Sequence, residues 1–150
     1  AAMLGGVAGH AGLFSNALDM GVLLQVFLQE GTYAGRQYVT PESIREFSSV
    51  QFAGNRNRRG LGFDKPSITT GQEGPGSKSA SPDSYGHSGF TGTYAWVDPA
   101  ENLVYGFLSN RTWPDQSNNG LARLNLRTDI LEAAYQAIEK SRQERPQHLP

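Results

Sequence analysis

The segment 85–109 constrains the fold most, because aromatic, β-branched and small residues alternate along it. Tyr94 and Trp96 stand two residues apart among smaller residues, and a second apolar run follows at 103–108. Between the two runs, the sequence Asp-Pro-Ala-Glu-Asn at 98–102 has the composition of a turn. We therefore expect residues 85–109 to form an antiparallel hairpin whose alternate side chains lie on opposite faces.

Helices are predicted on both sides of this hairpin along the chain. Ser15 is the expected N-cap of a first helix that Gly31 ends, and Thr40-Pro41-Glu42 has the cap, proline and acid of a second helix start. A third helix is expected to open at Asn118-Asn119-Gly120, because apolar residues then recur at helical spacing over 121–138. This order predicts an α+β fold in which helices cover an antiparallel sheet.

The remaining segments are polar or rich in glycine, which accounts for 18 of the 150 residues. Residues 60–64 are predicted to form a short strand. Residues 65–83 are predicted to form a long loop, which inside a compact domain is usually mobile or functional. Residues 144–150 are expected to be a frayed tail. The length of the whole chain, 1–150, suits one domain or a large portion of one.

Charge and hydropathy exclude several classes of partner. The formal net charge of −1 argues against a nucleic-acid partner. No apolar run approaches the roughly 20 residues of a membrane span. One small basic cluster is predicted to be a solvated loop, and it consists of Arg56, Arg58 and Arg59.

Metal and cofactor sites are not expected. The chain has no cysteine, which excludes disulfides and thiolate ligands. Its three histidines, His10, His87 and His148, are too dispersed in sequence to indicate a metal centre.

The segment 86–92, Gly-His-Ser-Gly-Phe-Thr-Gly, carries the most chemical information and admits two interpretations. The first is a nucleophile elbow, G-x-S-x-G, with Ser88 as nucleophile and Asp115 or Asp129 and then His148 completing a triad. However, phenylalanine stands at the final glycine position, and the following residues alternate like a strand. A nucleophile elbow requires a helix at this point.

The second interpretation is an edge strand beside a reaction centre. Here His87-Ser88-Gly89 resembles the third motif of the serine β-lactamase-like (penicillin-binding-protein-type) family, which is Lys-Thr-Gly in many members and His-Thr-Gly or His-Ser-Gly in others. Other segments resemble this family in the same order: the glycine-rich run 5–15 followed by Asp19, the sequence Leu61-Gly62-Phe63, and the sequence 108–111. The resemblance covers most of residues 5–135.

The resemblance implies a role for each residue of the motif. His87 would supply a donor or cation beside the substrate, and Ser88 a second hydrogen bond, so that both orient substrate and support proton transfer. Gly89 would leave room for substrate against the backbone, Thr91 would add a substrate contact, and the Phe90 N–H would be one of two oxyanion donors.

The nucleophile of this family lies in Ser-x-x-Lys, and no serine of this chain has lysine three residues on. The second motif is Tyr-x-Asn or Ser-x-Asn, and none of the six tyrosines has asparagine at that spacing. Both motifs precede the third in the family. We therefore expect this chain to be the C-terminal portion of a single domain, inactive alone and completed by an N-terminal half.

Such a portion should lack some strands of its sheet and expose an edge or an apolar face, so we expect self-association. The parent would act on small-molecule or peptidoglycan-like amide, ester or β-lactam substrates in the periplasm or cell envelope. One alternative is a non-catalytic accessory module fused to a larger envelope enzyme such as a glycoside hydrolase, with the 65–83 loop shaping the binding surface.

Overall fold

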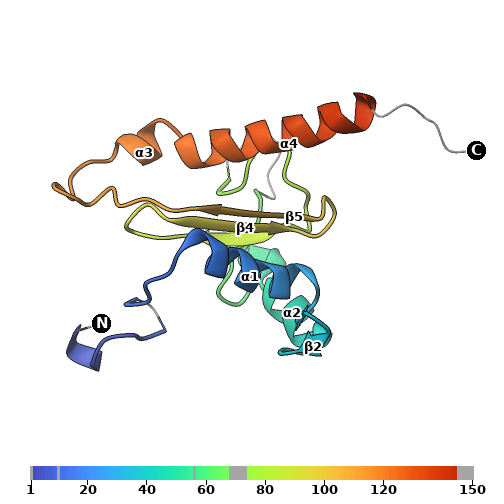
Figure 1. Cartoon of the computed structure of the whole chain (residues 1–150), viewed down its shortest axis with the longest axis horizontal. Coiled ribbons are helices and arrows are strands. Elements are labelled where there is room, and N and C mark those ends of the chain that lie inside the picture. Colours follow the sequence, from blue (N-terminus) through green and yellow to red (C-terminus); the bar gives the residue numbers. More distant parts are fainter. Residues whose placement is uncertain (1, 10, 56, 68–73, 145–150) are drawn as a thin grey trace, which may run out of the picture.

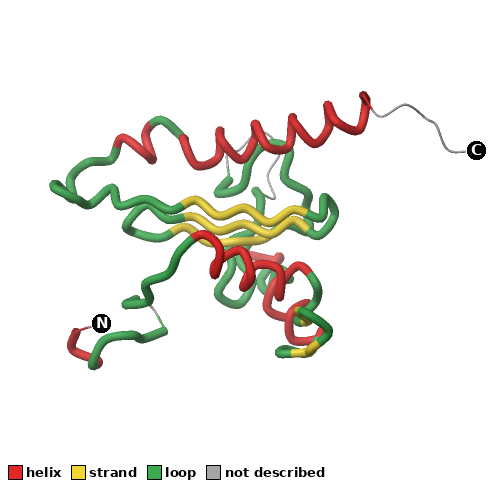
Figure 2. Tube along the Cα trace, viewed as in Figure 1, coloured by secondary structure: helices red, strands yellow, loops and turns green. Residues whose placement is uncertain are grey.

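A central antiparallel sheet lies between two helical layers in the computed structural model, which describes residues 2–9, 11–55, 57–67 and 74–144. Figure 1 shows helix α4 running along one face of the sheet, with α1 and α2 on the other side. The secondary-structure view in Figure 2 shows the three strands as one compact layer between the helices. The predicted α+β class, an antiparallel sheet covered by helices, is confirmed.

The sheet contains three strands in the order β3-β4-β5, and both strand pairs are antiparallel. The segment 85–109 therefore forms two consecutive hairpins, where the sequence predicted one. The three strands are β3 (Tyr85–Ser88), β4 (Tyr94–Asp98) and β5 (Leu103–Phe107).

The extra turn lies at 89–92, where the expected strand is interrupted. Gly92 donates from its N–H to the Gly89 carbonyl at 3.0 Å, and Gly89 donates to the Thr93 carbonyl at 2.8 Å. Gly92 has a φ of +97°, a left-handed conformation that glycine adopts without steric penalty. Its Cβ position would also meet the Ser109 hydroxyl, an end group that can rotate, so the left-handed φ is the reason for glycine in this turn.

Helix α1 (Ala17–Leu28) begins one residue later than its predicted cap implies. The N-cap is Asn16, whose side-chain oxygen accepts from the N–H groups of Leu18 and Asp19, both at 3.0 Å. The prediction of Ser15 as the cap is wrong, because asparagine is at least as good a cap as serine and stands at the position that reaches these two donors.

The apolar face of α1 covers one face of the sheet. Leu24 packs with Tyr85 and Val97 in a buried cluster, and Phe27 meets the ring of Phe63 edge-on with ring centroids 5.5 Å apart. This layer fixes β3, the strand that ends in the His-Ser pair.

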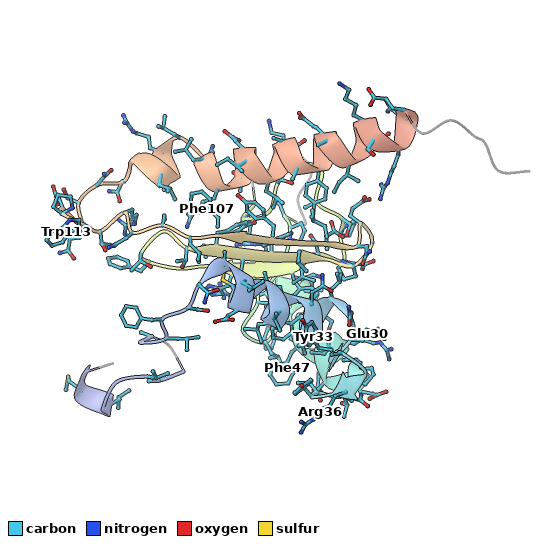
Figure 3. All side chains as sticks on the ribbon, viewed as in Figure 1. Glu30, Tyr33, Arg36, Phe47, Phe107 and Trp113 are labelled. Atoms are coloured by element: carbon cyan, nitrogen blue, oxygen red, sulfur yellow. The ribbon has the colours of Figure 1, made fainter. Side chains whose placement is uncertain are left out.

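A short hairpin and helix α2 follow α1. The predicted Thr40 cap is confirmed, since its hydroxyl accepts from the Ser43 N–H at 3.3 Å. Arg45 of α2 holds Glu30 through two hydrogen bonds of 2.9 and 2.8 Å, in the region where Figure 3 labels Glu30. The elements here are β1 (Thr32–Tyr33), β2 (Arg36–Gln37) and α2 (Pro41–Ser48), and 3-10 helices span Ala2–Leu4 and Ala53–Asn55.

Helix α4 (Leu126–Glu144) covers the other face of the sheet, and the short helix α3 (Gly120–Arg123) precedes it and contacts it. The single predicted helix is broken in two because Asn125 takes a left-handed φ of +51°. Leu131 and Tyr135 of α4 are buried against Tyr94 and Trp96 of β4, and Figure 3 shows Phe107 on the side of the sheet that α4 covers.

The strand predicted at 60–64 is absent; only Asp64 forms an isolated bridge, to Gly86 of β3. Gly62 has a φ of +86°, which is incompatible with extended backbone. The predicted loop 65–83 has no helix or strand in its described parts, 65–67 and 74–83. Of the predicted tail 144–150, Glu144 ends α4 and the other residues lie outside the described ranges.

The outer edge of β5 has no strand partner among the described residues. Large apolar side chains are also exposed on both helical layers, such as Leu18 and Leu23 on α1 and Ile130 on α4. Within the described ranges, no helix is long and apolar enough to cross a membrane.

Candidate functional site

The predicted His-Ser pair lies at the end of β3, and its two side chains lie on opposite faces of the sheet. In the strand register, His87 stands opposite Ala95 and Ser88 opposite Tyr94. Because side chains alternate along a strand, His87 belongs to the α1 face and Ser88 to the α4 face. The structure thus brings the two residues together along the backbone but gives their side chains different surroundings.

His87 is exposed and contacts an arginine that the sequence analysis assigned to a solvated loop. Arg59 Nη2 lies 3.0 Å from His87 Nε2, and His87 Nδ1 lies 2.8 Å from the Ser88 carbonyl oxygen. The Arg59 guanidinium also donates from Nη1 to Asp64 Oδ1 at 2.9 Å. Arg59 thus lies in a partly exposed loop, and its side chain also reaches the edge of β3.

Asp64 is the buried centre of this charged cluster. Its side chain is 9% exposed, and it pairs with Arg58 at 3.4 Å as well as with Arg59. Its backbone exchanges two hydrogen bonds with Gly86, of 2.7 and 3.0 Å, which attach it to the outer edge of β3. A buried carboxylate fixed in this way holds the two guanidinium groups beside the strand. Arg56, the third arginine of the predicted basic cluster, lies outside the described ranges.

Lys65 follows Asp64 and is also largely buried. Its Nζ donates to the Asp83 carbonyl oxygen at 2.9 Å and lies 5.7 Å from the centre of the Tyr85 ring. Burial lowers the pKa of Lys65, while Asp83 and Asp98 act in the opposite direction. The ammonium group is thus used to fix the loop against β3.

The turn after Gly89 carries the Phe90 N–H, the candidate oxyanion donor. Arg111 holds this turn: its Nε donates to the Phe90 carbonyl oxygen at 2.8 Å, and its guanidinium lies 4.6 Å from the centre of the Phe90 ring. Its Nη1 also donates to the carbonyl oxygens of Gln116 and Asn118, both at 3.0 Å. Arg111 therefore determines the position of Phe90.

A groove of about 1150 Å³ lies beside Ser88 on the α4 face. Its walls are the loop that includes 74–78, the Tyr94 side of the sheet, and the start of α4 with Arg127, Thr128 and Glu132. His87 is not among the residues that line it. The groove gives Ser88 access to a ligand-sized space, whereas His87 opens toward Arg59.

The other predicted site residues have varied outcomes. Thr91 is exposed in the turn, and its carbonyl accepts from the Arg111 N–H at 2.9 Å. A turn and strand β4 follow Ser88 directly in place of a helix, so the nucleophile elbow is not formed. His10 and His148 lie outside the described ranges. Within those ranges, no group of three or more histidine, aspartate or glutamate side chains is placed to hold a metal ion.

One Ser-x-Asn sequence does occur, Ser117-Asn118-Asn119, after the third motif and so out of the family order. Ser117 is exposed and donates to Asp115 Oδ2 at 2.8 Å in a local turn. Asp115 has a lowered pKa because it accepts from the Ser117 N–H and hydroxyl. We therefore assign this sequence to loop structure.

Sequence reasoning missed Arg59 and Asp64. Their spacing of five residues around Gly60 and Gly62 was the available signal, since two glycines permit a turn that brings the ends together. The predicted strand obscured this signal, because an extended segment would have kept the two residues apart.

Comparison with solved structures supports the architecture. A β-lactamase from Mycobacterium bovis superimposes with a TM-score of 0.61 at 21% identity, over 83% of this chain and 44% of that protein. At this identity the likeness concerns the fold: helices on an antiparallel sheet, of the β-lactamase-like kind.

Comparison with protein families and with curated proteins then identifies the family to which the chain belongs. The family model described as Beta-lactamase matches residues 1–129, and the chain belongs to this family of serine β-lactamase and penicillin-binding-protein-type domains. An N-acetylmuramyl-L-alanine amidase of Bacillus subtilis (strain 168) is 33% identical over 151 residues, and a putative D-alanyl-D-alanine carboxypeptidase of Escherichia coli (strain K12) is 40% identical over 110 residues. These matches cover 89% and 72% of this chain but only 32% and 24% of the two relatives, so the chain spans about a quarter to a third of their length.

Proposed function

We propose that this chain forms the motif-bearing wall of the active site in a hydrolase that cleaves amide or ester bonds. The observation that carries the proposal is the end of β3: His87-Ser88-Gly89 closes an edge strand, Ser88 lines a groove, and the next residue lies in a tight, exposed turn. Edge strands with this ending suit a substrate that lies against the backbone.

In this proposal each residue has the role that the motif implies. His87 and Ser88 orient substrate and support proton transfer, Gly89 leaves space, and Thr91 adds a contact. The Phe90 N–H donates to the oxyanion, a contribution of roughly 3 kcal/mol to transition-state stabilisation in hydrolases of this type. Its attachment to Arg111 supports this role, because an oxyanion donor acts through a fixed position.

The acylated serine is part of the same proposal. Since no serine here has lysine three residues on, we propose that a Ser-x-x-Lys segment outside this chain supplies the nucleophile and that the chain alone is inactive. The names of the curated relatives refer to N-acetylmuramyl-L-alanine and D-alanyl-D-alanine. Peptidoglycan-like amides are therefore the first substrates to test, and the cell envelope is the proposed location.

The test compares the purified chain with a longer product of its reading frame that includes the preceding segment. Both are assayed with nitrocefin, p-nitrophenyl acetate and a D-alanyl-D-alanine peptide, and acylated serines are located by mass spectrometry. We expect turnover and an adduct in the longer protein alone. Hydrolysis by the 150-residue chain, with a covalent adduct on one of its own serines, would show that the assignment of the nucleophile is wrong.

A binding role is the second candidate, favoured by the groove on the α4 face, whose lining includes Ser88 but not His87. The chain would then be an accessory module of a larger envelope enzyme such as a glycoside hydrolase. The preceding sequence discriminates the two: Ser-x-x-Lys and Tyr-x-Asn there support catalysis, and their replacement by other residues supports binding.

A further inference from the structure

We infer that Arg59 is a positioning residue for His87, which it holds as the neutral imidazole that carries its proton on Nδ1. The inference deepens the proposed function and rests on it for treating His87 as a site residue. It is carried by the contacts of three side chains, those of Asp64, Arg59 and His87, and of one backbone carbonyl.

The direction of the Arg59–His87 hydrogen bond follows from chemistry. A guanidinium has five N–H donors and no acceptor. At 3.0 Å from Arg59 Nη2, His87 Nε2 must therefore be the acceptor, and an accepting nitrogen carries no proton. The remaining ring nitrogen, Nδ1, then holds the proton and donates to the Ser88 carbonyl oxygen at 2.8 Å.

Arg59 keeps this orientation because Asp64 holds its other terminal nitrogen at 2.9 Å. The Asp64 side chain is only 9% exposed, and its backbone is paired with Gly86 of β3. Hydrogen bonds thus join Asp64, Arg59, His87 and the Ser88 carbonyl in this order, from a residue bridged to β3 to the end of β3 itself. Arg59 donates to both Asp64 and His87, and His87 in turn donates to the Ser88 carbonyl oxygen.

Two consequences follow for the site. The imidazole fixes the peptide that joins Ser88 to Gly89, which leads directly into the turn with the Phe90 N–H. The positive charge beside the motif also belongs to Arg59, whose side chain is 43% exposed, and His87 acts in its neutral form. Of the two expected roles of His87, donor or cation, this arrangement gives His87 that of a donor and Arg59 that of the cation.

The test reads the tautomer directly in the whole chain, without substrate. Two- and three-bond ¹H–¹⁵N correlation spectra at neutral pH distinguish a protonated Nδ1 from a protonated Nε2, and loss of one signal in His87→Asn assigns His87 among the three histidines. We expect the Nδ1–H form to dominate in the unmodified chain. In Arg59→Met its population should fall, because Nε2 loses its donor while only the Ser88 carbonyl still favours a proton on Nδ1, and Arg59→Lys should restore it, because an ammonium group is also donor-only.

Arg58→Met is the matched control, because Arg58 contacts Asp64 but not His87. It should leave the tautomer unchanged. A dominant Nε2–H form in the unmodified chain would overturn the inference, whether or not Arg59→Met folds. An unchanged tautomer in a folded Arg59→Met variant would overturn it as well. Because the spectra need no turnover, failure of this inference is distinguishable from failure of the proposed hydrolase activity.

Discussion

At the scale of single residues, small differences in position decide which side chain performs a role. Ser15 and Asn16 are neighbours with similar capping chemistry, yet it is Asn16 whose side chain accepts from the N–H groups of Leu18 and Asp19 in the first turn of α1. Ser15 instead forms a 3.4 Å contact from its hydroxyl to the Asn16 carbonyl oxygen. Hydrogen-bonding capacity alone therefore could not identify the cap.

Asn16→Ala should destabilise the chain by about 1 kcal/mol, because α1 loses its N-cap. Ser15→Ala is the matched control and should leave the free energy of unfolding nearly unchanged. Urea unfolding followed by circular dichroism measures both. Equal losses in the two variants would contradict the assignment of the cap.

Asp98 is a second residue whose role depends on its position in the fold more than on its residue type. It is completely buried and accepts from the Ser81 N–H and hydroxyl at 2.9 and 2.6 Å, and from the Tyr135 hydroxyl at 2.7 Å. It thereby connects the loop before β3 and helix α4 to the end of β4. Burial and this hydrogen bond raise the pKa of Tyr135.

Asp98→Ala should lower the free energy of unfolding by about 3 kcal/mol or more, since several buried donors lose their acceptor at once. Asp115→Ala removes an exposed aspartate that binds only its neighbour Ser117 through its side chain, and it should leave the urea midpoint close to that of the unmodified chain. A small effect of Asp98→Ala would mean that water or another acceptor replaces the carboxylate.

At the scale of elements, the sheet depends on close approach of its strands. Gly86 of β3 stands opposite Trp96, and a Cβ at this position would meet the Ala95 carbonyl and the indole ring. Around the Cβ position of Gly21, in the middle of α1, no heavy atom beyond the backbone of its own helix lies within 4 Å. Close packing thus requires glycine at position 86, whereas the space around position 21 would admit a side chain.

Gly86→Ala should destabilise the chain by about 1 to 3 kcal/mol through overpacking of β3 against β4. Gly21→Ala should stabilise it by about 0.5 to 1 kcal/mol, because alanine favours a helix interior. Thermal unfolding of both variants gives the comparison. Shifts of the same sign would show that backbone propensity outweighs the packing described here.

The elements were largely predictable and the site only in part. Strong local signals, such as Thr40-Pro41-Glu42 and the alternation through Tyr94 and Trp96, identified α2 and the hairpin sheet. The turn at 89–92 and the break at Asn125 were missed, because each depends on one left-handed residue that periodicity does not reveal. Arg59 reaches His87 only through the folded loop, so sequence gave no direct sign of that contact.

At the scale of the whole molecule, buried tyrosines make the free energy of unfolding decrease as the pH becomes alkaline. Burial raises the pKa of Tyr85 to about 12, with a smaller contribution from Glu30. An unfolded tyrosine loses its proton near pH 10. Between about pH 10 and 12 the unfolded chain therefore binds fewer protons than the folded one, and stability falls as pH rises.

Tyr85→Phe should flatten this dependence by up to about 2 kcal/mol across the window. The loss of its 3.2 Å hydrogen bond to the Phe27 carbonyl shifts stability at every pH and leaves the slope unaffected. Lys65, whose pKa is lowered by burial, acts in the opposite direction in both proteins, so the difference between their slopes isolates Tyr85. Identical slopes would contradict the buried environment of Tyr85.

The alternation of His87 and Ser88 across the sheet has a consequence for how this segment tolerates change in length. Removing or adding one residue between Tyr85 and the turn would move each following side chain to the other face of the sheet. Ser88 would then face Arg59, and His87 would face the groove. Substitutions at either position leave the other in place, whereas a single-residue deletion exchanges both environments at once. The spacing of this short strand is therefore as much a part of the site as the identity of its side chains.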